Sequence, residues 1–208
     1  MSYIAVVGSR SLPLSWRSRV SAVVSSLLAR GLSVGSGGAL GADLFALRAL
    51  VLSGASACSG SVVFLPGRLE QAPRSCRSWL ASFRRLGGRV VPGPARPGAG
   101  RREFVSALFA RTRRLVRGSR GVVAFVCGPS RGTWFTCSFA ASLGLPVVVF
   151  PACAPARRSG GESSAGRPVE GPSALRSLPA CHSQSGRGHG RWVPLRCWPG
   201  AFRWASGS

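Results

Sequence analysis

Short apolar runs alternate with amphipathic stretches along residues 3–150, and this alternation restricts the possible fold more than any other feature. Apolar runs bounded by turn residues are typical of buried strands, and apolar residues at helical spacing are typical of helices. We predict strands over 3–7, 32–34, 61–65, 89–91, 121–126 and 146–150. We predict helices over 20–28, 43–52, 72–86, 101–117 and 133–143. Residues 92–100 are expected to form a loop because they are rich in proline and glycine.

Strands that alternate with helices, and that are apolar on both faces, are typical of a parallel sheet covered on both sides. We therefore predict an α/β domain at residues 1–154, with a Rossmann-like, doubly wound, mostly parallel sheet and helices on both faces. From residue 155 the composition changes to arginine, glycine, serine and proline without usable periodicity. This change predicts a disordered basic tail over residues 155–208.

The charge of the chain is strongly positive, because 28 basic residues face only 5 acidic ones and the net charge is +23. Every basic residue is arginine, and 20 of them lie in residues 1–154. A GC-rich coding sequence would favour arginine, but it would not by itself remove aspartate and glutamate. The balance therefore indicates a polyanionic partner, with nucleic acid ahead of a membrane surface.

The sequence predicts a cytoplasmic protein without a membrane segment. No apolar run approaches the ~20 residues that span a bilayer. The amino terminus leads directly into a predicted strand and lacks the pattern of a signal peptide. The chain has seven cysteines, an odd number without a framework, and this favours reduced thiols over disulfides.

Three glycine-containing loops follow predicted strands, at residues 8–10, 35–43 and 128–133. In a doubly wound fold they lie at the sheet edge where ligands bind. Glycine lets backbone N–H groups approach an anion, a following helix N-terminus favours negative charge, and hydroxyl and guanidinium groups add donors. We therefore predict a phosphate-containing ligand. The loop residues expected to bind it are Gly8, Ser9, Arg10, Ser36, Gly37, Gly38, Gly41, Asp43, Ser130, Arg131, Gly132 and Thr133.

A dinucleotide cofactor is not expected, although Gly35, Gly37 and Gly41 have a spacing close to that of a dinucleotide fingerprint. The motif follows the second strand instead of the first. About twenty residues further on, residues 54–61 offer no carboxylate for a ribose. We therefore expect no cofactor. Two interpretations of Asp43 stay open, since it can complement the dipole of its helix or contact the ligand.

The sequence offers few residues that could support catalysis or bind a metal. The two histidines, His182 and His189, lie in the predicted tail, so the domain offers no imidazole. Glu70 and Glu103 are its only carboxylates besides Asp43, and no motif places them together. Cysteines and histidines of the tail match no common zinc spacing, and we expect no metal site. The candidates for that site are Cys181, His182, His189 and Cys197.

Four segments of the chain resemble, in their sequence order, the SLOG superfamily. They are VVGSR at residues 6–10, GSGGALGADLFAL at 35–47, ARTRRLV at 110–116 and SRGTWFTCSFAASLGLPVVVF at 130–150. The superfamily groups the DNA processing protein A family, the lonely-guy phosphoribohydrolases and small uncharacterised Rossmann-like nucleotide binders. The resemblance covers about residues 3–151 and implies a nucleotide-binding domain.

The residue matches favour the DNA processing protein A family and the small nucleotide binders. The glycine loop at residues 36–43 is similar to the S-G-x-A-x-G-x-D segment of DNA processing protein A. Its R-N-R segment resembles residues 111–113, which implies that Arg111 and Arg113 contact phosphates. The small nucleotide binders share the S-R-G-T-W segment that begins at Ser130.

Thr136 occupies a position that separates the branches of the superfamily. In the lonely-guy enzymes this position holds a glutamate that takes part in glycosidic cleavage, so the resemblance to those enzymes does not extend to that chemistry. In DNA processing protein A it is a threonine of the G-T-L-x-T segment, and the match adds Thr136 to the predicted ligand-binding residues. Whether the chain is an enzyme stays open.

Two functions follow as hypotheses. The first is binding of nucleotide phosphates through glycine-rich loops and arginines, with single-stranded DNA as the ligand. The alternative is an enzyme or sensor for a free nucleotide, through phosphoribohydrolase-like N-glycosidic cleavage or binding of an ADP-ribose-type ligand. A homodimer is one expected assembly. No catalytic residue is assigned.

Overall fold

The apolar runs form parallel strands in a computed structural model of the chain, which describes residues 3–152, 190–194 and 202–206. The strands are β1 (Tyr3–Gly8), β2 (Ser33–Ser36), β3 (Val62–Phe64), β4 (Arg89–Val91), β5 (Ser119–Val126) and β6 (Val147–Pro151). They lie in the order β4-β3-β2-β1-β5-β6, and every neighbouring pair among them is parallel. This order confirms the predicted Rossmann-like, doubly wound sheet.

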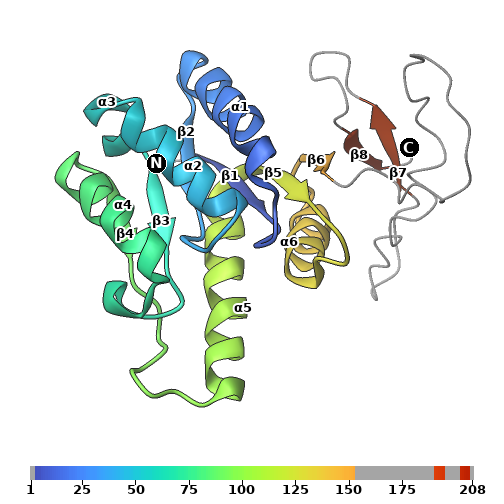
Figure 1. Cartoon of the computed structure of the whole chain (residues 1–208). Coiled ribbons are helices and arrows are strands. Elements are labelled where there is room, and N and C mark those ends of the chain that lie inside the picture. Colours follow the sequence, from blue (N-terminus) through green and yellow to red (C-terminus); the bar gives the residue numbers. More distant parts are fainter. Residues whose placement is uncertain (1–2, 153–189, 195–201, 207–208) are drawn as a thin grey trace, which may run out of the picture.

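Helices cover both faces of the sheet, as expected (Figure 1). The helices are α1 (Arg17–Ala29), α2 (Ala42–Leu52), α3 (Ala55–Ser59), α4 (Arg74–Arg85), α5 (Arg101–Arg117) and α6 (Arg131–Ser142). Successive strand residues point to opposite faces. Val6 and Val63 therefore pack with α1 to α4, whereas Val7 and Val62 pack with α5 and α6. Each face has its own apolar core, and the sheet is buried between them.

The observed element boundaries differ from the predicted ones where short segments carry little periodicity. Helix α1 begins three residues before the predicted start, because its first turn is exposed and has no apolar signal. The predicted helix over 72–86 starts only at Arg74, with Pro73 as its N-cap, and a 3-10 turn (Leu69–Gln71) precedes it. Another 3-10 turn, Leu14–Trp16, precedes α1, and helix α3 was not predicted because five residues are too few for a helical pattern.

Two segments of the predicted tail form strands, β7 (Gly190–Pro194) and β8 (Phe202–Ser206). Strand β8 pairs antiparallel with β6, and β7 pairs antiparallel with β8. The prediction of disorder is therefore wrong for these two segments. The edge of β6 offers unpaired backbone groups, and a segment without an apolar pattern can satisfy them. The division at residue 154 stays a prediction, and the four zinc candidates lie outside the described residues.

The described cysteines agree only in part with the expectation of reduced thiols. Cys58, Cys76 and Cys137 are buried and keep reduced thiols. Cys127 is disulfide-bonded, so the expectation is wrong at this residue. Within the described ranges, no helix has the length and apolar character that crossing a membrane requires.

The single tyrosine of the chain provides a test of the packing between β1 and α5. The Tyr3 hydroxyl is buried and donates a hydrogen bond to the Leu115 carbonyl oxygen at 2.8 Å. Burial raises the pKa of Tyr3 to about 12, although Arg89 and Arg114 lower it. An unfolded tyrosine titrates near pH ~10. The neutral hydroxyl therefore stabilises the fold fully below pH ~10, and this contribution is lost as the pH rises toward about 12.

We expect the tyrosinate absorbance of the folded protein to rise with a midpoint near pH 12. The Tyr3→Phe variant should lose the part of the pH dependence of unfolding that lies between these two pKa values. A midpoint near pH ~10 in protein that circular dichroism shows to be folded would contradict the buried hydroxyl.

Candidate functional site

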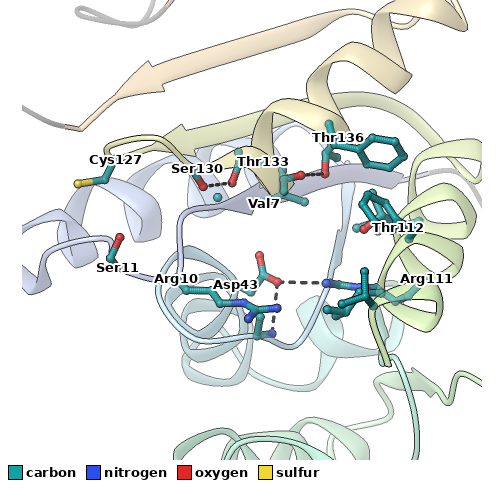
Figure 2. Close-up of a pocket in the computed structure, with 18 of the residues that line it drawn as sticks. Val7, Arg10, Ser11, Asp43, Arg111, Thr112, Cys127, Ser130, Thr133 and Thr136 are labelled. Carbon is teal, nitrogen blue, oxygen red and sulfur yellow. Dashed lines mark hydrogen bonds and ion pairs between the residues drawn. The ribbon is translucent and has the colours of Figure 1, made fainter. Parts of the chain in front are cut away.

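The loops after β1, β2 and β5 meet at one edge of the sheet, because these three strands are neighbours and parallel. The chain first winds outward from β1 to β4 and then returns to place β5 beside β1. Ligands of doubly wound sheets bind where the winding reverses in this way. A cavity of about 500 Å³, here called the main cavity, lies at this place between the loops, α5 and the start of α6 (Figure 2).

Ser9 links the β1 loop to the β5 loop by hydrogen bonds. Its backbone N–H donates to the Phe125 carbonyl oxygen at 2.8 Å. Its hydroxyl accepts the Cys127 N–H at 2.7 Å and donates to the Cys127 carbonyl oxygen at 3.1 Å. Gly8 lies so close that a Cβ atom there would be 2.3 Å from the Phe125 carbonyl oxygen. These two residues therefore set the spacing of the loops, and the Ser9 hydroxyl is already occupied.

The β2 loop passes close to the β1 loop at Gly41. The φ angle of Gly41 is +68°, and a Cβ atom there would be 2.2 Å from the Ser9 carbonyl oxygen. The Ala42 N–H donates to the same oxygen at 3.4 Å. Positive φ and this close approach both require glycine. The turn delivers the chain into α2, whose first turn carries Asp43.

Asp43 and Arg111 form an ion pair at the floor of the main cavity. Arg111 Nη1 lies 3.6 Å from Asp43 Oδ2, and the two side chains are 10% and 6% exposed. The Ala39 N–H also donates to Asp43 Oδ2, at 3.2 Å. Gly37 lies beneath the pair, since a Cβ atom there would be 1.5 Å from Arg111 Nη1. The glycine loop therefore makes room for the guanidinium that the carboxylate holds.

Burial has the largest influence on both charges of this pair. It raises the pKa of the Asp43 carboxyl, and the Arg111 guanidinium, the Ala39 N–H and Arg10 oppose this rise. Burial lowers the pKa of Arg111; Asp43 counteracts the change, and the like charge of Arg10 adds to it. The carboxylate is thus engaged with Arg111, and Arg10 is a second cation without a carboxylate of its own in the described part of the chain.

Hydroxyl groups at the start of α6 line the opposite wall of the main cavity (Figure 2). The Ser130 and Thr133 hydroxyl oxygens lie 2.8 Å apart in a hydrogen bond. One turn further on, the Thr136 hydroxyl donates to the Gly132 carbonyl oxygen at 2.9 Å. In the first turn of α6, the Thr133 and Trp134 N–H groups already donate to the Ser130 carbonyl oxygen at 3.0 Å, so only the N–H groups before them are left for a ligand. Cations and hydroxyl groups thus face each other across the cavity, and one hydroxyl of the Ser130–Thr133 pair keeps its hydrogen for a ligand.

The structure distributes the fifteen predicted site residues over four places. Those that line the main cavity are Gly8, Arg10, Asp43, Arg111, Ser130, Gly132, Thr133 and Thr136. Gly37 and Gly38 line a neighbouring cavity of about 240 Å³, which shares Arg10 and Arg111 with the main cavity. Ser9, Ser36 and Gly41 are buried and line neither cavity. Arg113 and Arg131 are exposed and also line neither.

The main cavity has an apolar rim that the sequence did not predict. Val105 and Phe109 of α5 are 40% and 39% exposed and line the cavity together with Phe135 of α6. The Phe109 and Phe135 rings meet edge to face, with centroids 4.6 Å apart. In the sequence these residues resemble ordinary core positions of two helices. Only the exposed fraction of Val105 and Phe109 distinguishes them, and that fraction depends on how the helices pack.

Gly41→Ala is expected to lower the free energy of unfolding by about 3 kcal/mol. The added Cβ atom causes strain at positive φ, and it also clashes with a backbone oxygen. Gly31→Ala is the matched control: its φ is +69°, but nothing lies within 4 Å of its added Cβ atom. The control should cost only about 1 kcal/mol. Urea unfolding of both variants measures the difference, and equal costs would argue against the close approach of the two loops.

Comparison with known proteins places the chain in a family. The family model described as DNA recombination-mediator protein A matches residues 1–166. The chain belongs to this family. The match confirms the resemblance found in the sequence motifs. No curated protein matches the chain.

Two solved structures of DNA processing protein A share the fold. The protein from Helicobacter pylori is 20% identical, with a TM-score of 0.57, and the alignment covers 72% of this chain and 65% of that one. The protein from Streptococcus pneumoniae is 23% identical, with a TM-score of 0.57, and the alignment covers 74% of this chain and 51% of that one. This member of the DNA recombination-mediator protein A family thus spans less than two thirds of the length of either structure.

Proposed function

We propose that this chain binds single-stranded DNA, with a phosphate of the strand at the main cavity. The arrangement of Arg10 carries the proposal. Arg10 is exposed, lines the cavity and has no ion pair in the described residues. It faces the hydroxyls at the start of α6 across the cavity (Figure 2). A cation opposite hydroxyl and backbone donors suits a phosphate group.

The charge of the whole chain favours a polymeric ligand over a small one. The net charge of +23 exceeds what one mononucleotide would neutralise. Binding to a strand releases counterions from each neutralised phosphate, so many arginines contribute to affinity. The solved structure from Helicobacter pylori is described as showing a single-stranded DNA binding mode. Membership of the family extends that ligand to this chain as part of the proposal.

We assign distinct roles to the two arginines of the cavity. Arg10 contacts the phosphate directly. Arg111 is held by Asp43 through Nη1, while its Nε atom is buried without a hydrogen-bond partner in the described residues. A bound strand that accepts a hydrogen bond from this atom would remove the cost of leaving it unpaired. The glycines of the three loops serve mainly to bring these groups and backbone N–H donors together.

A free nucleotide is the second candidate ligand, and the enclosed carboxylate favours it. Among the described residues that line the main cavity, Asp43 is the only carboxylate. It could accept hydrogen bonds from a ribose or a base. Thr136 replaces the glutamate that the lonely-guy enzymes use, and its hydroxyl already donates to Gly132. A sensor for an ADP-ribose-type ligand therefore fits this site better than an N-glycosidase does.

Fluorescence anisotropy with labelled oligo-dT tests the proposal, and a panel of mononucleotides and ADP-ribose tests the alternative. We expect micromolar or tighter binding of oligo-dT that weakens steeply between roughly 50 and 200 mM salt. Saturable binding of one free nucleotide, combined with loss of oligo-dT binding at about 150 mM salt, would overturn the proposal in favour of the alternative. Release of a free base from the nucleotide would identify an enzyme.

A further inference from the structure

Helices α5 and α6 carry matching rows of side chains that continue outward from the main cavity. On α5, Phe109, Arg113 and Arg117 follow one another at spacings of four residues. On α6, Phe135 and Phe139 have the same spacing. Residues four apart lie on one face of a helix. Each helix thus presents a row to its neighbour, and together the five residues form what we call the arginine–phenylalanine ladder.

The contacts within the ladder are regular. The Arg113 guanidinium lies 5.9 Å from the centroid of the Phe135 ring, and the Arg117 guanidinium lies 5.7 Å from that of Phe139. The Phe135 and Phe139 rings are parallel within 2°, with centroids 6.1 Å apart. Two cation–aromatic pairs are therefore repeated at an interval of one helical turn, about 5.4 Å along the axis.

The ladder is continuous with the main cavity. Phe109 and Phe135 both line that cavity and meet edge to face. From this pair, the row leads along α5 and α6 to Arg113, Phe139 and Arg117. A DNA strand whose phosphate lies in the cavity could therefore pass over Phe109 and follow the ladder along the same two helices.

The two ladder arginines are available to bind the phosphate of a ligand. Both are exposed, and neither has an ion pair within the described residues. Stacking on a ring orients a guanidinium while its N–H donors stay available for a phosphate. Aromatic side chains beside such cations are the usual platform for the bases of a single strand. Glu103, the only acidic residue of α5, lies six residues before Phe109 and is also exposed.

We propose that the arginine–phenylalanine ladder is an extension of the binding site, which holds the phosphates of single-stranded DNA on Arg113 and Arg117 as the strand leaves the main cavity. The inference rests on the proposed function, since it names the path of the same ligand. The ladder contributes two phosphate contacts that a ligand confined to the cavity does not make. It therefore raises the affinity for long oligonucleotides and does not change the affinity for short ones.

The test compares the double variant Arg113→Ala/Arg117→Ala with Arg84→Ala/Arg85→Ala in the full chain. Both remove two exposed arginines from a helix, but α4 lies on the opposite face of the sheet. The probes are oligo-dT of about 4 and about 16 nucleotides, which bracket the usual sizes of single-strand sites. Circular dichroism establishes that each variant is folded. A third variant, Arg113→Lys/Arg117→Lys, retains the charge without the planar guanidinium.

We expect the ladder variant to bind the long oligonucleotide on the order of tenfold more weakly, with affinity for the short one unchanged. The slope of log K against log salt for the long oligonucleotide should be smaller by about 1.4, which is ~0.7 for each of two phosphates. The lysine variant should fall between the ladder variant and wild type. The α4 variant should change the long-probe affinity less than twofold.

Two results would contradict the proposal that the ladder binds DNA, and they differ from the results that would contradict the cavity proposal. Equal losses in the α5 and α4 variants would show that only overall charge matters. An equal loss on the short and long probes would place the two arginines in the cavity site. If wild type binds the long probe through the ladder but Arg10→Ala changes neither affinity, the cavity proposal fails and the ladder stands. If wild type binds neither probe, both proposals fail.

Discussion

Replacing Asp43 by alanine is expected to lower the free energy of unfolding by about 3–5 kcal/mol, as is usual when one partner of a buried ion pair is removed. The variant leaves the Arg111 guanidinium, whose side chain is 10% exposed, without its counter-charge. It also removes the acceptor of the Ala39 N–H. Burial already lowers the pKa of Arg111, and the nearby Arg10 lowers it further. Urea unfolding followed by circular dichroism measures the loss.

The double variant Asp43→Ala/Arg111→Leu separates the buried charge from the loss of packing. Removal of both charges should restore part of the stability, because an apolar side chain of moderate size replaces an uncompensated cation. The double variant is therefore expected to be more stable than Asp43→Ala alone. A cost below about 1 kcal/mol for Asp43→Ala would mean that Arg111 turns into the main cavity and becomes hydrated, and the pair would then not organise the site.

Replacing Arg10 by alanine is expected to weaken oligo-dT binding roughly 10- to 100-fold, since it removes charge-assisted hydrogen bonds to a phosphate. The slope of log K against log salt should decrease by about 0.7. Stability should stay the same or increase slightly, because Arg10 is exposed and its charge disfavours the buried Arg111 cation. Anisotropy titrations at several salt concentrations, with urea unfolding alongside, measure both effects.

Arg74→Ala is the matched control for Arg10→Ala. Arg74 is also an exposed arginine, at the start of α4, and it lines neither cavity. Its removal changes the net charge equally but should leave oligo-dT affinity within about twofold. Arg10→Lys should retain part of the affinity, because lysine keeps the charge but loses the bidentate geometry. Equal effects of Arg10→Ala and Arg74→Ala would indicate binding through overall charge alone.

The glycine loops show which parts of the site the sequence could indicate. Gly8, Gly37 and Gly41 were predicted as phosphate contacts. That role stays a prediction, and in the structure each of them also permits a close approach: to Phe125, to Arg111 and to the Ser9 carbonyl oxygen. A glycine pattern identifies where the backbone must come near another group. It does not identify that group, because the group comes from a distant part of the chain.

Arg111 and Arg113 show the same limit on one helix. Both were predicted to contact phosphates, since the two belong to one short segment. The packing of α5 turns Arg111 into the floor of the main cavity beside Asp43 and places Arg113 over the Phe135 ring outside it. The side chains of residues two apart on a helix point in nearly opposite directions. Their different surroundings could be assigned only after the helix was placed against the sheet.

The sequence by itself determined the order of the six parallel strands and of five of the helices, the sheet edge where the loops gather, and the excess of positive charge. Those properties follow from local periodicity, turn residues and composition, which need no knowledge of distant contacts. Only the tertiary structure decided that Asp43 pairs with Arg111, that Ser9 links two loops and that α5 and α6 form the arginine–phenylalanine ladder. These contacts join residues far apart in the sequence, so their geometry depends on how the layers pack.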